Sequence, residues 1–230
     1  MGKQTTKLTL ADTIYTNIRE DITQHIILPG EKINIKELAK RYGVSETPVK
    51  FALNRLISEN IIENFPRQGM KVHSVTSDEV DEIFDTRLML DMYYIKQIIL
   101  TVSFNDALKE EFRKNIDEHL QLVTDLSPDS PIEDYLRNYE LDYKFHELYL
   151  KCSGNHKIVE IYHYINPFLY SNFIFRRQSK VKDISGVKEH EAILQAILAG
   201  DETALKEALT IHITNAKTAI ALILKVDKII

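Results

Sequence analysis

The chain has 230 residues, of which 44% are apolar and 27% are charged, with only 7 Gly and 6 Pro. This composition is typical of a helix-rich globular protein and excludes a disordered chain or a β-sandwich. The length allows one large domain or two small ones. The single cysteine excludes an internal disulfide, and neither a secretory leader nor a membrane span is recognised in the sequence. We therefore expect a cytoplasmic protein with no membrane partner.

Charge is distributed unevenly along the chain. Residues 1–76 contain 11 Lys and Arg against 8 Asp and Glu, a net charge of +3, whereas residues 77–230 contain 18 against 26, a net charge of −8. The basic end is the candidate nucleic-acid end. Three charges are a weak argument alone, so the prediction depends on the order of elements.

The first 76 residues predict three helices followed by a β-hairpin. A row of isoleucines at i,i+4 spacing marks the first helix, between about Leu8 and Ile26. Asn34, with Glu37 three residues later, predicts the start of a second helix that ends at Gly43. Ser45 is expected to cap a third helix that runs to about Asn60. Residues 61–65 and 70–72 read as two short strands around a turn, which completes the order of a winged helix-turn-helix domain.

After residue 76 the pattern is helical throughout. The first of six predicted helices begins at Ser77 and includes Ile98, and the others lie near residues 105–125, 132–151, 156–179, 187–199 and 202–226. Pro167 should kink the fourth of these helices. The expected fold is therefore mainly α, with a winged helix-turn-helix domain at residues 1–76 and an antiparallel six-helix bundle at residues 77–230.

In a helix-turn-helix, the N-terminal residues of the third helix reach base edges in the major groove, while cations on the flanks and wing bind phosphates. Each of these charges taken singly is better explained as part of a solvated surface. The ordered set favours contact with double-stranded operator DNA. The candidate DNA-binding residues are Lys36, Lys40, Arg41, Ser45, Glu46, Thr47, Lys50, Arg55, Arg67, Gln68 and Gly69.

Five stretches of this segment resemble the GntR family of bacterial regulators. They are residues 28–33 (LPGEKI), 38–45 (LAKRYGVS), 47–50 (TPVK), 52–56 (ALNRL) and 66–69 (PRQG), within a resemblance that covers residues 10–76. Two positions depart from the family pattern: Glu46 stands where Arg is usual, and Lys50-Phe51 stands where Arg-Glu is usual. The operator sequence is therefore not transferable from the family.

The second half of the chain places four potential metal ligands on inward helix faces. Asp142 and His146 are four residues apart on one predicted helix, and His190 and His212 lie on the apolar faces of two later ones. Each histidine by itself is more often a hydrogen-bonded core residue than a ligand. Together, three imidazoles and one carboxylate predict a divalent cation in the bundle, with Zn, Ni or Mn as candidates.

The same residues resemble the FCD effector domain of FadR-like GntR regulators. The resemblance covers residues 80–222 and also includes Ser153-Gly154-Asn155 and Ala199-Gly200-Asp201. It implies that Asp142, His146, His190 and His212 hold a metal whose open positions accept water or an effector carboxylate. Candidate effector-binding residues are Arg87, Asn138 and Arg176. For Arg87 an ion pair with Asp91, four residues on, is an equally good explanation.

The sequence thus favours a homodimeric transcription regulator controlled by a small carboxylate, and not an enzyme. A helical metalloenzyme that activates water for hydrolysis is one alternative, although no separate general base is evident near the four ligands. A pure metal sensor is a second alternative. Neither the effector, the operator, the resident metal nor the sign of regulation can be read from the residues.

Overall fold

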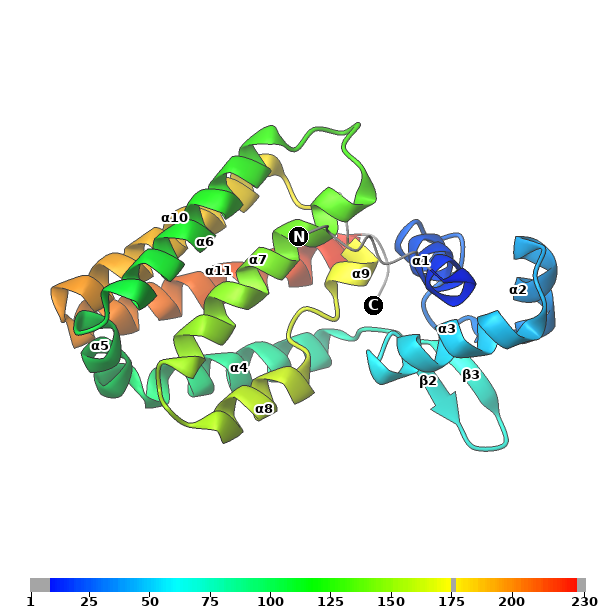
Figure 1. Ribbon diagram of the computed structural model, residues 1–230, viewed down its shortest axis with the longest axis horizontal. Coiled ribbons are helices and arrows are strands. Elements are labelled where there is room, and N and C mark those ends of the chain that lie inside the picture. The colour runs from blue at the N-terminus through cyan, green and yellow to red at the C-terminus, as the bar shows by residue number, and fades with distance from the viewer. Residues whose placement is uncertain (1–8, 175–176, 227–230) are drawn as a thin grey trace, which may run out of the picture. The chain divides into compact units, whose positions relative to one another are not determined.

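The computed structural model describes residues 9–174 and 177–226. The chain divides into two compact units, Met1–Ser74 and Val75–Ile230, which we call the head and the helical unit. Their helices and strands are labelled in Figure 1. The mainly helical fold, with a small sheet confined to the head, confirms the predicted fold class.

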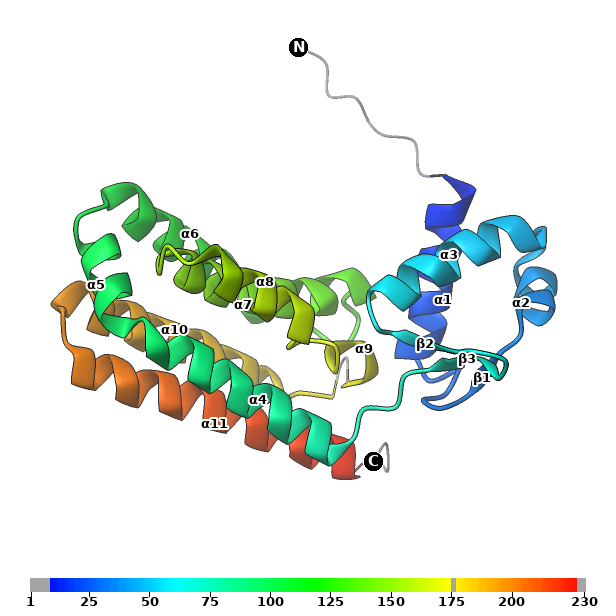
Figure 2. The same cartoon turned by 90° about the horizontal axis from the view of Figure 1, so that it is seen from below.

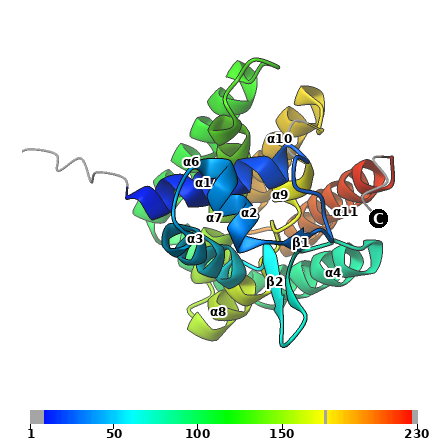
Figure 3. The ribbon, with the colours of Figure 1, turned by 90° about the vertical axis from the view of Figure 1, so that its right-hand side faces the viewer.

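The head has the element order of a winged helix-turn-helix. Its three helices and three strands are α1 (Leu10–Thr23), β1 (Lys32–Ile33), α2 (Ile35–Tyr42), α3 (Glu46–Ser58), β2 (Ile62–Phe65) and β3 (Gly69–Val72). The strands form an antiparallel sheet in the order β1-β3-β2, in which Ile62 pairs with Val72 and Lys32 with Lys71. Figure 3 shows the α2–α3 pair and the β2 strand of the wing. Sequence reasoning missed β1, because a two-residue strand leaves no periodic signal.

Local sequence explains where the helices of the head begin and end. The Asn34 side chain accepts hydrogen bonds from the backbone amides of Lys36 and Glu37, as predicted for the start of α2. Gly43 ends α2 in the left-handed conformation at φ 66°, which glycine adopts without a steric penalty. The first helix ends earlier than predicted, at Thr23, and Ile26 beyond it is 54% exposed.

The helical unit contains eight helices among its described residues, where six were predicted. They are α4 (Ser77–Tyr93), α5 (Ile95–Ser103), α6 (Asp106–Asp125), α7 (Ile132–Lys151), α8 (His156–Ile165), α9 (Ser171–Ile174), α10 (Lys180–Ala199) and α11 (Glu202–Val226). Figure 2 shows α4 and α11 side by side, and α10 packs against α6 and α11. A continuous apolar core fills the space between the helices.

Three predicted boundaries in the helical unit were wrong. Tyr94 interrupts the first predicted helix and separates α4 from α5. Asn166 adopts the left-handed conformation and ends α8 before Pro167, so this proline follows a helix instead of kinking one. Ser179 caps α10 through the Lys182 amide, and α10 therefore starts seven residues before the predicted position and runs through Gly186.

The last helix, α11, is long and apolar enough by length and composition to cross a membrane, which the sequence reading did not anticipate. Its inward residues, among them Leu205, Leu209 and Leu224, are buried in the helical unit. The apolar composition of α11 is therefore partly explained by its place in a protein core.

Candidate metal centre and nucleic-acid interface

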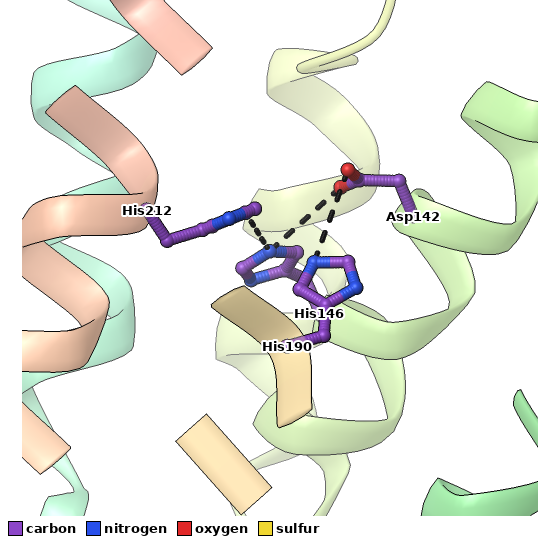
Figure 4. A group of neighbouring side chains, drawn as sticks. All are labelled: Asp142, His146, His190 and His212. Atoms are coloured by element: carbon purple, nitrogen blue, oxygen red, sulfur yellow. Dashed lines mark hydrogen bonds and ion pairs between the residues drawn. The ribbon is translucent and has the colours of Figure 1, made fainter. Parts of the chain in front are cut away.

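The four predicted metal ligands meet inside the helical unit. Asp142 and His146 project from α7, His190 from α10 and His212 from α11, and Figure 4 shows their side chains pointing toward one another. One donor atom from each residue lies within 4.8 Å of the donor atoms of the other three. The i,i+4 spacing on α7 places Asp142 and His146 on one face, and helix packing brings the other two rings to it.

The separations within the cluster suit a shared cation. The Nε2 atoms of His146 and His212 lie 3.0 Å apart. The Asp142 carboxylate lies 3.8 Å from Nε2 of His146 and 3.8 Å from Nε2 of His190. Two nitrogen ligands that each lie ~2.0–2.1 Å from one metal ion are themselves about 3 Å apart. The three imidazoles therefore present the same ring nitrogen to a common point.

Two carboxylates outside the cluster orient two of the rings. Nδ1 of His146 lies 3.1 Å from Oδ2 of Asp91, and Nδ1 of His212 lies 3.0 Å from Oε2 of Glu189. Asn215 donates a hydrogen bond of 2.8 Å to the other oxygen of Glu189. A carboxylate that accepts a hydrogen bond from Nδ1–H keeps the proton on Nδ1 and so leaves the Nε2 lone pair free to bind metal.

Sequence reasoning assigned neither Asp91 nor Glu189 to this site. The available signal was the position of Glu189 beside His190 and of Asp91 on an inward helix face. Neither position reveals which ring the carboxylate faces. That relation depends on how α4 packs near α7 and how α10 packs against α11.

His190 has polar atoms that no described group satisfies. It is fully buried, neither ring nitrogen has a hydrogen-bond partner among the described residues, and the ring stacks on Phe145 at 4.0 Å between centroids. Within the described part of the chain, Oδ1 of Asp142 also lacks a hydrogen-bond partner. Buried polar atoms without partners are costly and rare. A cation bound by Nε2 of His190 and by Oδ1 of Asp142 would give each of these two atoms a partner, so the donor set fits a metal.

Burial also keeps the rings in the form that binds metal. Desolvation holds the pKa values of His146 and His190 well below the usual histidine range, so both rings are neutral near pH 7. Burial acts in the opposite direction on the carboxyl group of Asp91 and raises its pKa to about 7.

Arg87, a predicted effector-binding residue on α4, is 1% exposed and lies beside the cluster. Its Nη2 is 3.7 Å from Oδ1 of Asp142, and its guanidinium group lies over the rings of Phe84 and Phe168. The ion pair is thus with Asp142, whereas the sequence alternative paired Arg87 with Asp91. Nε and Nη2 of Arg87 have no hydrogen-bond partner among the described residues, which is an unusual state for a buried cation.

A small cavity of about 40 Å³ adjoins the four-residue cluster. Asn138, the second predicted effector-binding residue, lines it, donates a hydrogen bond of 3.1 Å to Asp183 and lies 2.7 Å from Nε2 of His119. The third, Arg176, falls outside the described residues. The cavity is lined by His119, Asn138, Tyr139, Asp142, Phe168, Tyr170, Gln178, Lys182, Asp183, Gly186, Glu189, His212, Ala216 and Ile220.

The predicted DNA-binding residues lie on the surface of the head. All of them are exposed except Glu46, which is half-buried. Ser45 occupies the N-cap position of α3, but its side chain makes no capping hydrogen bond. Of the predicted wing residues, Arg67 and Gln68 lie in the β2–β3 turn and Gly69 is the first residue of β3; Arg67 and Gly69 have positive φ values.

Three of the predicted DNA-binding cations also make contacts within the head. Lys50 pairs with Glu46 at 3.1 Å, and Arg41 pairs with Asp21 at 2.8 Å. Arg55 lies 3.7 Å from the centre of the Tyr15 ring and also pairs with Glu59. Arg55 therefore holds α1 and α3 together, which is a structural role that the spacing of charges did not reveal.

The chain begins with a winged helix-turn-helix that exposes cations, and continues into a helical unit with a buried ligand cluster and an adjoining cavity. This combination defines a class of DNA-binding regulators that carry a sensory domain. Residues 10–72 match the bacterial regulatory proteins of the gntR family, and residues 82–215 match the FCD domain. The chain belongs to the GntR family, among the members that carry an FCD domain. It is a transcription regulator and not an enzyme, and the resemblance inferred from its sequence is confirmed.

Similar proteins of known sequence match along most of the chain. The HTH-type transcriptional regulator YdhC of Bacillus subtilis is 24% identical over 204 residues, which is 87% of this chain and 86% of YdhC. The gluconate operon transcriptional repressor of Bacillus licheniformis is 26% identical over 204 residues, which is 84% of this chain and 77% of that protein.

Solved structures share the fold at low sequence identity. McbR/YncC of E. coli has a TM-score of 0.64 and 18% identity, with 95% of this chain and 99% of that chain covered. The Lar protein of Listeria monocytogenes has a TM-score of 0.68 and 16% identity, and the match covers 93% of this chain and 97% of Lar. The metal-free FCD domain of TM0439 has a TM-score of 0.52 and 19% identity, and the match covers 66% of this chain and 98% of that domain.

Proposed function

We propose that this regulator binds operator DNA as a homodimer, and that a small organic acid held at a metal ion in the helical unit controls the binding. Residues 1–76 would contact DNA, and residues 77–230 would bind the effector and dimerise. The observation that carries the proposal is the convergence of four donor atoms, from three helices, within 4.8 Å of one another. A regulator that contacts operator DNA in a bacterial cell works in the cytoplasm.

The proposed metal ligands are Asp142, His146, His190 and His212, and Zn, Ni and Mn all accept nitrogen and carboxylate ligands. A divalent ion would compensate the half-buried carboxylates of Asp142 and Glu189, and it would give a partner to Nε2 of His190 and Oδ1 of Asp142, which have no hydrogen-bond partner among the described residues. When bound, the ion would offer open positions to the oxygen atoms of an anionic ligand.

A carboxylate is the proposed ligand because two cationic groups would face it. Arg87 is buried, two of its nitrogen atoms have no hydrogen-bond partner among the described residues, and the metal would supply the second positive centre. Farther along the cavity wall, Asn138 and Gln178 carry amides suited to polar substituents of an organic acid. Both amides contact Asp183, at 3.1 Å and 2.6 Å, so the cavity wall is an ordered polar network.

The size of the cavity suggests how binding would be coupled to shape. About 40 Å³ holds a few water molecules and is much smaller than a ~150 Å³ cavity that accepts benzene. An organic acid of several carbon atoms must therefore displace side chains that line the cavity. Differential binding worth about 1–3 kcal/mol between two dimer geometries would change operator occupancy several-fold or more.

Metal analysis of purified variants tests the site. The unmodified protein should contain close to one equivalent of divalent metal per chain after dialysis, and His190→Ala and His212→Ala should lose most of it. His163→Ala is a matched control, because His163 pairs with Glu147 at the surface and lies outside the cluster. Full retention of metal in both cluster variants would reject the assignment.

Titration of the metal-loaded protein with small organic acids tests the effector. An acid that binds should change operator affinity, and Arg87→Gln should weaken acid binding while metal content is retained. If operator affinity follows metal concentration and no acid alters it, the protein is a metal sensor. The hydrolase alternative is disfavoured by membership of a family of transcription regulators.

A further inference from the structure

The exposed stripe of α3 contains an aromatic side chain that the helix-turn-helix fold does not require. Thr47, Lys50, Phe51 and Asn54 share one face of α3, because Lys50 and Phe51 each lie three or four residues from both Thr47 and Asn54. The opposite face, which includes Val49, Leu53 and Leu56, is buried in the head. Phe51 is 64% exposed, the highest value for a large apolar side chain among the described residues of the head.

Charge on this stripe is locally balanced. Lys50 is paired with Glu46 at 3.1 Å, so these two side chains together carry no net charge. Exposed cations outside this pair occur at Lys36 and Lys40 on α2 and at Arg67 in the wing. Flanking cations hold a recognition helix against phosphates without reading sequence, so discrimination between bases depends on the stripe itself.

We propose that Phe51 reads a thymine by packing its ring against the C5 methyl group in the major groove, and that Asn54 reads an adenine in a neighbouring base pair. The major-groove edge of thymine is the only one with a methyl group, and apolar side chains are the groups that recognise it. Asparagine matches the N6 and N7 atoms of adenine in a bidentate pair. Three residues of helix advance ~4.5 Å, which is more than the ~3.4 Å spacing of successive base pairs, so Phe51 and Asn54 can reach different base pairs.

A single apolar side chain at a surface is ordinary, so the exposure of Phe51 carries weight only because of its place on α3. The other positions of the stripe, Thr47, Lys50 and Asn54, carry hydrogen-bonding or charged side chains. Duplex DNA is therefore the occupant that matches both the apolar ring and the polar side chains of the stripe.

Deoxyuridine substitution tests the contact, because uracil differs from thymine only by the missing methyl group. Operator sites are first selected from random duplex DNA with the full chain, and each thymine of the selected site is then replaced singly. At one position per half-site, uracil should weaken binding about fourfold, the factor that corresponds to ~0.8 kcal/mol for one buried carbon group. At other thymines the change should be smaller than twofold.

Variants assign the effect to the side chains. Phe51→Ala and Phe51→Gln should bind the thymine and uracil operators equally at that position, and Asn54→Ala should relax the preference for adenine beside it. Phe104→Ala is the matched control, because Phe104 is 88% exposed but belongs to the helical unit, and this variant should keep the fourfold ratio. The variants at Phe51 should unfold at the temperature of the unmodified protein, since the ring is exposed.

Several results would overturn the proposal. One is equal binding of every uracil-substituted operator by the unmodified protein, and another is an unchanged thymine-to-uracil ratio in the Phe51 variants. Selected operators that lack an adjacent thymine and adenine would contradict it as well. Complete loss of DNA binding in both Phe51 variants would show that the ring serves the fold or a protein contact instead.

Discussion

His146 and His212 approach each other through the same ring nitrogen: their Nε2 atoms lie 3.0 Å apart, while each Nδ1 faces a carboxylate, of Asp91 and Glu189 respectively. When both Nδ1 atoms donate to carboxylates, both Nε2 atoms present lone pairs to each other. Two lone pairs at this separation repel unless a cation or a proton lies between them. The helical unit is therefore arranged so that a bound metal removes a repulsion as well as forming bonds.

Metal binding should stabilise the helical unit. Addition of a divalent ion at one hundred times its dissociation constant should add about 2.7 kcal/mol to the free energy of unfolding, because the folded state alone holds all four ligands together. Thermal unfolding with and without chelator measures the difference. His212→Ala should show almost no metal-dependent shift, whereas an equal shift in that variant would place the bound ion elsewhere.

Removal of the outer carboxylate at Glu189 should weaken metal binding without removing a ligand. Glu189→Gln leaves the ring of His212 in place but replaces the carboxylate that accepts a hydrogen bond from its Nδ1–H, and such changes typically cost 10–100-fold in metal affinity. Competition with a chromophoric chelator measures the affinity. Glu147→Gln, which changes a carboxylate that faces the surface residue His163, should leave it unchanged. Equal affinities in the two variants would show that Glu189 does not support the site.

The buried ring of His119 should make the metal-free protein sensitive to acid. Burial lowers its pKa in the folded state, while the unfolded chain has a value of about 6.5. The stability that this neutral ring contributes is therefore present above about pH 6.5 and is lost as the pH falls through the folded pKa, by up to ~1.4 kcal/mol per pH unit.

The contribution of His119 is measured by difference, since other buried groups titrate over the same range. Asp91, for example, has a raised pKa and acts in the opposite direction. Denaturant unfolding in the presence of chelator at pH 7.5 and pH 5.5 should show a smaller loss of stability for His119→Gln than for the unmodified protein. An identical loss in both proteins would mean that His119 is protonated equally in the folded and unfolded states.

Salt dependence should separate cations that bind phosphate from cations that hold the head together. Each lost phosphate contact should reduce the slope of log affinity against log salt by about 0.9, so Lys50→Ala and Arg67→Ala should both flatten it. Arg55→Ala should instead lower the thermal stability of the head, because Arg55 lies against Tyr15 and pairs with Glu59. Operator affinity measured at several salt concentrations gives the slope for each variant. An unchanged slope for Lys50→Ala or Arg67→Ala would exclude that residue as a phosphate contact.

The head was the more predictable of the two units. Its signals are local and act within a few residues of their position: Asn34 caps α2, Gly43 ends it, and buried residues recur every three or four positions on α3. The boundaries in the helical unit were less predictable. A continuous pattern of apolar residues does not show that α4 stops before Tyr94 or that α8 ends at Asn166. Packing with distant helices selects these turns.

By itself, the sequence determined which helix faces are apolar, and therefore that Asp142, His146, His190 and His212 point into the interior of a helical unit. Periodicity has this power because each helix must bury one face whatever its neighbours are. Only the tertiary structure decided that Asp91 orients His146, that Glu189 orients His212 and that Arg87 pairs with Asp142. Contacts between different helices depend on how those helices pack, and no spacing within one helix encodes their partners.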